Sequence, residues 1–189
     1  MKLDLALVHY PVLDKNREII GSAVTNLDLH DLARAGKTYG VRTLHIVTPF
    51  GDQQRLVNEI CAHWCQGHGA SYNPLRREAI SILKVSESLD VLFKDYRRQG
   101  EERPLTLATS AKGGAGTLGY GDLRQRLASG EHCLIVFGTG WGLAPAVMEM
   151  VDAVLPPIAG TSAYNHLSVR AACAIILDRL LGEREEILV

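Results

Sequence analysis

Three glycines follow an apolar run late in the sequence. The run spans 134–137, and Gly138, Gly140 and Gly142 come directly after it. A buried strand that ends in small residues lets a ligand approach the main chain closely. The spacing is not the GxGxxG of a dinucleotide-binding turn, which lies early in a strand–helix–strand unit. These residues therefore predict a binding site built mainly of backbone, with Trp141 as a lid or a packed side chain.

Two later segments have the same character. A short apolar strand at 153–155 is followed by two prolines and then by Gly160, and a polar turn at 164–168 leads into a long apolar helix. Parallel sheets bind ligands at the carboxyl ends of their strands. We therefore expect one site formed by the loops after Thr109, Phe137 and Leu155.

Strand-like and helix-like segments alternate along the whole chain, which predicts an α/β fold, a mostly parallel sheet with helices on both faces. Expected strands lie at 3–8, 43–48, 84–85, 104–109, 133–137 and 153–155. Thr25 or Asn26, Asp52 and Ser88 are the expected caps of three helices. Further helices are expected to begin at 74, 122, 145 and 167, and the last of them runs to 181. With no internal repeat or linker, residues 1–189 form one expected domain. The polar loop at 10–21 is long for a compact domain, so a functional role is plausible.

Composition limits the classes of function. The net charge of −1 disfavours a protein that coats nucleic acid, although a local basic face is enough to bind RNA. Four scattered cysteines indicate free thiols in a reducing compartment, and the chain is expected to be cytoplasmic. No apolar run is long enough to span a membrane. Cys61, Cys65 and His68 lack a fourth ligand, so no metal is expected.

Two motifs resemble those of the SPOUT superfamily of knotted methyltransferases, in particular its SpoU-type branch. The segment TNLDLHDLARAGKTYGV at 25–41 resembles the first motif, with Arg34 in the place of the family's arginine. The family's asparagine falls on Asp28, while Asn26 stands two residues earlier. The turn 165–168 resembles the Asn-x-x-Ser entry to the last helix.

The resemblance implies a stand-alone S-adenosylmethionine-dependent RNA methyltransferase with a C-terminal trefoil knot. It implies a tRNA or rRNA substrate, transfer to a ribose 2′-oxygen or a base nitrogen, and a homodimer formed through the last helix. The implied catalytic residues are Arg34, Asp28 and Asn165. The expected cofactor-binding residues are Thr109, Ser110, Phe137, Gly138, Thr139, Gly140, Trp141, Gly142, Leu143, Leu155, Pro157, Ile158, Gly160, Asn165, Leu167 and Ser168.

Alternatives remain open at this stage. Asn165 and Ser168 are also good helix-capping residues, and Arg34 is also an ordinary surface residue. The glycine-rich segment suits an oxidoreductase or another α/β domain that binds a different nucleotide. The whole chain could also be a noncatalytic RNA-binding or regulatory module that retains the pocket.

Overall fold

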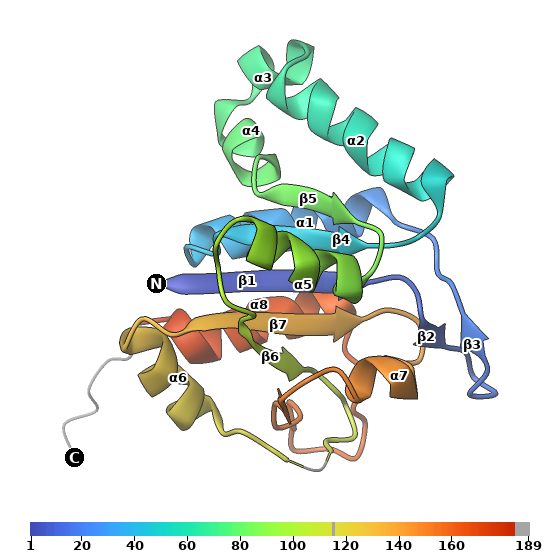
Figure 1. Cartoon of the computed structure of the whole chain (residues 1–189), viewed down its shortest axis with the longest axis vertical. Coiled ribbons are helices and arrows are strands. Elements are labelled where there is room, and N and C mark those ends of the chain that lie inside the picture. Colours follow the sequence, from blue (N-terminus) through green and yellow to red (C-terminus); the bar gives the residue numbers. More distant parts are fainter. Residues whose placement is uncertain (115, 184–189) are drawn as a thin grey trace.

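A six-stranded, fully parallel sheet forms the centre of the computed structural model, which describes residues 1–114 and 116–183 (Figure 1). The strand order is β5-β4-β1-β7-β6-β8. The strands are β1 (Lys2–Val8), β4 (Thr43–Val47), β5 (Leu83–Ser86), β6 (Leu105–Ala108), β7 (His132–Gly138) and β8 (Ala153–Val154). The predicted α/β architecture with a mostly parallel sheet is therefore confirmed.

Helices cover both faces of this sheet, as the alternation predicted. They are α1 (Asn26–Thr38), α2 (Gly51–Cys65), α3 (His68–Tyr72), α4 (Pro74–Ile80), α5 (Leu89–Arg98), α6 (Tyr120–Ala128), α7 (Pro145–Met148) and α8 (Val169–Leu181). One face packs against α1, α2, α4, α6 and α8, and the other against α5 and α7. Figure 1 shows α1 and α8 behind the sheet and α5 in front. None of the helices in the described ranges is long and apolar enough to cross a membrane.

Local signals explain where the helices start and stop. The side chain of Thr25 accepts a hydrogen bond from the Asp28 N–H, and Ser168 caps α8 in the same way. Gly40 follows α1 with a φ of +73°, a left-handed conformation that glycine adopts without strain. The expectation that Asp52 caps α2 is wrong. Phe50 precedes that helix without a side-chain hydrogen bond, and Asp52 lies in its first turn, where a carboxylate favours the helix dipole.

The segment predicted as a loop at 10–21 contains a small antiparallel hairpin. Its strands are β2 (Val12–Leu13) and β3 (Ile19–Ile20). Strands of two residues are too short to be recognised from the alternation of apolar and polar residues in the sequence. The hairpin lies beyond the carboxyl end of β1, beside the loop that follows β7, where Val12 forms a bridge with Leu143 (Figure 1).

A buried charge occupies the opposite, amino-terminal edge of the sheet. Asp4 is fully buried, and both of its carboxylate oxygens accept hydrogen bonds from Arg42, at 3.0 and 2.6 Å. Tyr96 donates to the same carboxylate at 2.8 Å, and His132 lies 2.9 Å from it. Burial alone would raise the pKa of Asp4, but the bonds from His132, Arg42 and Tyr96 outweigh it and hold that pKa well below its ordinary value.

His45 extends this network and carries one unpaired ring nitrogen. Tyr96 gives its hydroxyl proton to the ionised Asp4, so the His45 Nε2–H must donate to the Tyr96 oxygen, at 3.3 Å. That leaves His45 Nδ1 as an acceptor without a hydrogen-bond partner in the described part of the chain. Burial lowers the pKa of His45 to about 4.

This burial predicts a pH dependence of stability. Below its ordinary pKa of 6.5 the unfolded His45 binds a proton that the folded residue refuses until about pH 4, so stability falls as pH falls through this window. His45→Gln keeps a donor toward Tyr96 and removes the titration. We expect it to reduce the loss of unfolding free energy between these pH values by up to about 3 kcal/mol.

The measurement is urea unfolding at a series of pH values, with His68→Gln, at an exposed position, as the matched control. A His45→Gln protein with the same pH slope as the wild type would contradict the assignment. Burial also lowers the pKa values of His9 and His30, so part of the slope should remain.

Candidate functional site

The parallel register places the ends of four strands on one edge of the sheet. Val8 pairs with Gly138, and Ala108 pairs with both Val136 and Val154. The segments that follow β6, β7 and β8 therefore leave the sheet at the same edge, the one toward which β1 and β7 point in Figure 1. Parallel α/β sheets bind ligands at this edge.

Four segments that were predicted to form the site contact one another there: the loops after β6, β7 and β8, and the turn 164–168. The Asn165 side chain donates to the carbonyl oxygen of Ala111 at 2.9 Å, which joins the turn before α8 to the loop after β6. The rings of Trp141 and His166 lie 5.8 Å apart, which joins that turn to the loop after β7. A Cβ placed on Gly113 would lie 3.6 Å from Pro157, so the loop after β8 is also in contact.

The loop 138–143, hereafter the glycine loop, owes two of its glycines to internal packing. A Cβ at Gly138 would lie 2.8 Å from the Leu143 nitrogen, and one at Gly140 would lie 2.8 Å from the Leu13 carbonyl oxygen. Gly140 also has a φ of +59°. The sequence suggested that these glycines make room for a ligand, but at both positions the protein's own backbone fills the space.

Gly142 and Gly160 are different, because a Cβ at either would meet nothing within 4 Å. Both therefore border open space beside exposed main chain. Asn165 is half-buried in the turn before α8, and its carbonyl oxygen Oδ1 has no hydrogen-bond partner among the described residues. Open space beside main chain and a free neutral acceptor fit the hydrogen-bonding groups of a nucleoside.

The other predicted cofactor-binding residues differ in whether their side chains are accessible to a ligand. Phe137 and Leu155 are buried in the core, so only their main chain can reach a ligand. The hydroxyls of Thr109 and Thr139 donate to main-chain carbonyls of the neighbouring strands. Side chains at least partly accessible belong to Ser110, Trp141, Pro157, Ile158 and Leu167. Ser168 caps α8, so the capping interpretation holds for it; Asn165 instead bonds to Ala111.

The structure pairs Asp28 with a residue that sequence reasoning missed. Arg170, in the first turn of α8, lies 3.7 Å from the Asp28 carboxylate and 3.8 Å from that of Asp31. The Thr25 hydroxyl also donates to Asp28, at 2.6 Å. Asp28 thus lies at the start of α1, where it links the first motif to the last helix. No feature of the sequence connects residues 28 and 170 in advance.

Arg34 lies apart from these loops within one chain. It is exposed on α1, six residues beyond Asp28, and six residues of helix span about 9 Å. Its side chain makes no hydrogen bond or ion pair with any part of the chain that the structure describes, and its carbonyl accepts from the Thr38 hydroxyl. Among the described residues, no hydrogen bond or ion pair joins the two predicted catalytic residues Arg34 and Asn165 within one protomer.

His9 is a second residue that the sequence reading passed over. It follows β1 directly, is fully buried, and lies 3.0 Å through Nδ1 from the Ser22 hydroxyl. Burial lowers the pKa of His9, against an opposing effect of the nearby Asp28 carboxylate. The available signal was a histidine placed immediately after the first buried strand.

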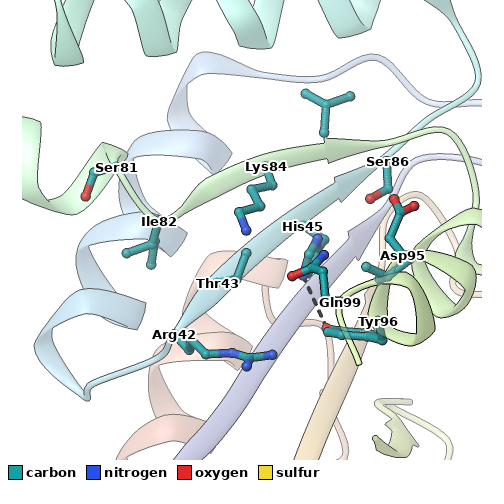
Figure 2. A pocket seen from close by; sticks show the side chains of 12 residues that line it. Arg42, Thr43, His45, Ser81, Ile82, Lys84, Ser86, Asp95, Tyr96 and Gln99 are labelled. Atoms are coloured by element: carbon teal, nitrogen blue, oxygen red, sulfur yellow. Dashed lines mark hydrogen bonds between the residues drawn. The ribbon is translucent and has the colours of Figure 1, made fainter. Parts of the chain in front are cut away.

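A cavity of about 310 Å³ lies elsewhere on the molecule. Figure 2 shows it between α5 and the strands β4 and β5, with His45, Lys84, Tyr96 and Gln99 among the lining residues. In the sheet order, β1 separates this corner from the strands β6, β7 and β8 that carry the four segments. In the described ranges, no group of three histidine, cysteine or acidic side chains is placed to hold a metal ion.

Comparison with known proteins identifies the family of the chain. A tRNA (guanine-N(1)-)-methyltransferase of Oleidesulfovibrio alaskensis is 42% identical over 178 residues, which is 94% of this chain. The chain spans only 41% of that relative's length. An uncharacterized protein of Aquifex aeolicus is 38% identical over 179 residues, or 94% of this chain and 87% of its own.

A solved structure supports the fold. The SpoU methyltransferase AviRb from Streptomyces viridochromogenes, determined with the cofactor AdoMet, matches with a TM-score of 0.59 and 14% identity. The match covers 95% of this chain and 57% of AviRb. The family model described as SAM-dependent RNA methyltransferase matches residues 2–182, nearly the whole chain. The chain belongs to this family of S-adenosylmethionine-dependent RNA methyltransferases.

Proposed function

We propose that the glycine loop, the loops after β6 and β8, and the turn 164–168 hold S-adenosylmethionine and present it to RNA. The observation that carries this placement is the convergence of the four segments on one sheet edge through Asn165, Trp141 and Pro157. When bound, the cofactor supplies the methyl group. The chain's own contribution is alignment, since main chain and neutral polar groups line the open space.

Individual side chains take distinct parts in this proposal. Asn165 holds the loop after β6 with its amide nitrogen and offers Oδ1 to the cofactor. Gly142 and Gly160 leave the main chain accessible. Asp28 is held by Arg170 and Thr25, so its part is to fix the start of α1 against α8.

The substrate is proposed to be a tRNA or rRNA, methylated on a ribose 2′-oxygen or a base nitrogen. The guanine-N1 specificity named for the Oleidesulfovibrio relative belongs to a protein more than twice as long, so it identifies no atom for this chain. Methylation of unmodified RNA with labelled cofactor, followed by mass spectrometry of the nucleosides, tests the proposal. Absence of any methylated nucleoside with tRNA and rRNA would refute it.

We also propose a homodimer in which Arg34 of one protomer serves the loops of its partner. Within one chain Arg34 is exposed and unpaired among the described residues, while α1 lies alongside α8. The planar guanidinium suits an RNA phosphate or a developing oxyanion at the acceptor. The trefoil knot that the resemblance implies stays a prediction.

Gly160→Val tests the placement of the cofactor. The added side chain enters space that is open in the protein, so the fold should survive while the affinity for S-adenosylhomocysteine falls at least about tenfold, equivalent to about 1.4 kcal/mol. Isothermal titration calorimetry measures the affinity. Gly51→Val is the matched control, because that glycine also has open space around it but lies at the start of α2. Gly140 is unsuitable, since a side chain there meets the Leu13 backbone. Wild-type affinity in a folded Gly160→Val protein would place the cofactor elsewhere.

Arg34→Ala tests the role of the arginine. We expect cofactor affinity within a few-fold of wild type and methyl transfer lowered by on the order of 10²-fold, as for the loss of one charge-stabilising donor. Arg34→Lys should recover little, because an ammonium does not reproduce the planar fork. Single-turnover methylation and calorimetry give the two readouts. Undiminished transfer, or a collapse of cofactor binding, would rule this role out.

A mixing experiment tests whether Arg34 acts across a dimer. At limiting S-adenosylmethionine, Arg34→Ala lowers transfer and Gly160→Val lowers cofactor occupancy, so each homodimer has little activity. In a mixed dimer the loops of the first variant meet the intact arginine of the second. We therefore expect about a quarter of wild-type activity after equal mixing with subunit exchange, since half the dimers are mixed and each has one complete site. Activity no higher than that of the separate variants would mean that Arg34 acts within its own chain. Light scattering establishes the dimer mass independently.

A further inference from the structure

A chain of hydrogen bonds connects His9 to the glycine loop. His9 Nδ1 lies 3.0 Å from the Ser22 hydroxyl, and that hydroxyl makes a short hydrogen bond with the hydroxyl of Thr139. Thr139 in turn lies 3.0 Å from the carbonyl oxygen of Val8. The main chain joins the same two residues, because the Ser22 N–H donates to the His9 carbonyl oxygen at 2.8 Å.

The direction of the protons in this chain follows from the acceptor at its end. Val8 offers only a carbonyl oxygen, so the Thr139 hydroxyl donates to it. The proton between the two hydroxyls then comes from Ser22, and His9 Nδ1 must carry the proton that reaches Ser22. His9 is therefore the Nδ1–H tautomer, and its Nε2 is an acceptor without a hydrogen-bond partner among residues 1–114 and 116–183.

The segment that begins at His9 also sets the glycine loop through main chain. Leu13 donates to the Gly142 carbonyl and accepts from the Trp141 N–H, both at 2.9 Å. Ala144 donates to the Pro11 carbonyl at 3.3 Å. The glycine loop is thus held on one side by the hairpin and at its first turn by Thr139.

We propose that His9 is a positioning residue, which acts through Ser22 and Thr139 to preset the glycine loop for the methyl donor. This inference rests on the proposed function of the glycine loop. His9 need not touch the cofactor: it is fully buried, and the proton on Nδ1 is what fixes Ser22 and, through it, Thr139. A histidine that only filled space in the core would contribute its shape and not this proton.

Substitutions at residue 9 distinguish the effect of the Nδ1 proton from the effect of the side chain's shape. Asparagine places an N–H near the position of Nδ1, whereas leucine fills the site without a donor. We expect His9→Leu and Ser22→Ala each to weaken S-adenosylhomocysteine binding by about five- to tenfold, the scale of one hydrogen bond, and His9→Asn to bind within about twofold of wild type. With RNA at saturating cofactor, kcat should stay within about twofold of wild type while KM for S-adenosylmethionine rises.

The double variant His9→Leu/Ser22→Ala checks that the two residues act in one chain. Its loss of affinity should match that of either single variant, because one broken link already frees Thr139. Losses that multiply, or wild-type affinity in both single variants, would overturn the inference. Ser22 is only half-buried, so Ser22→Ala gives a folded test even where His9→Leu does not fold.

Gly160→Val separates this inference from the proposed function. If Gly160→Val weakens binding and the His9 and Ser22 variants do not, only the positioning role fails. If the wild type does not bind S-adenosylhomocysteine, or Gly160→Val binds as tightly as the wild type, the placement of the cofactor fails and the positioning role fails with it.

Discussion

The parallel pairing of β1 with β7 is the contact on which the rest of the structure depends. It joins residues 2–8 to residues 132–138 and places both strands at the centre of the sheet. The glycine loop begins where this pairing ends on one strand, and His9 follows it on the other. A shift of one residue in this register would turn every buried side chain of β1 to the opposite face and separate His9 from Thr139.

The two edges of the sheet hold different kinds of polar group. At the amino edge, Asp4 is enclosed by Arg42, Tyr96 and His132, so both oxygens of a buried charge are hydrogen-bonded. At the carboxyl edge, His9 Nε2 and Asn165 Oδ1 have no hydrogen-bond partner in the described residues, and open space borders Gly160 and Gly142. The first arrangement favours a rigid sheet, and the second leaves space and the half-buried Asn165 Oδ1 available for a ligand.

The sequence predicted the fold well because its signals are local and regular. Apolar runs such as 134–137 predicted the strands, and the capping residues Thr25 and Ser168 predicted where helices begin. Parallel pairing then places the carboxyl ends of the strands at one edge of the sheet. The hairpin was missed because β2 and β3 have two residues each. Contacts between distant segments could not be predicted from one sequence. Examples are the packing of Gly140 against Leu13 and the pairing of Asp28 with Arg170. Arg34 shows the same limit, since helix periodicity gives its exposure but not the surface that it faces.

The hairpin and the glycine loop are separated by more than a hundred residues, and this has a consequence for biogenesis. On the ribosome the amino-terminal segment emerges many seconds before its partner, at the usual rate of about 5–20 residues per second. Until residue 142 has left the exit tunnel, Leu13 lacks its partners Trp141 and Gly142, and until residue 138 has left it one side of β1 lacks its neighbour. Such high contact order slows folding and exposes a bare strand edge to chaperones. The four segments of the proposed site therefore come together only after residue 168 has emerged.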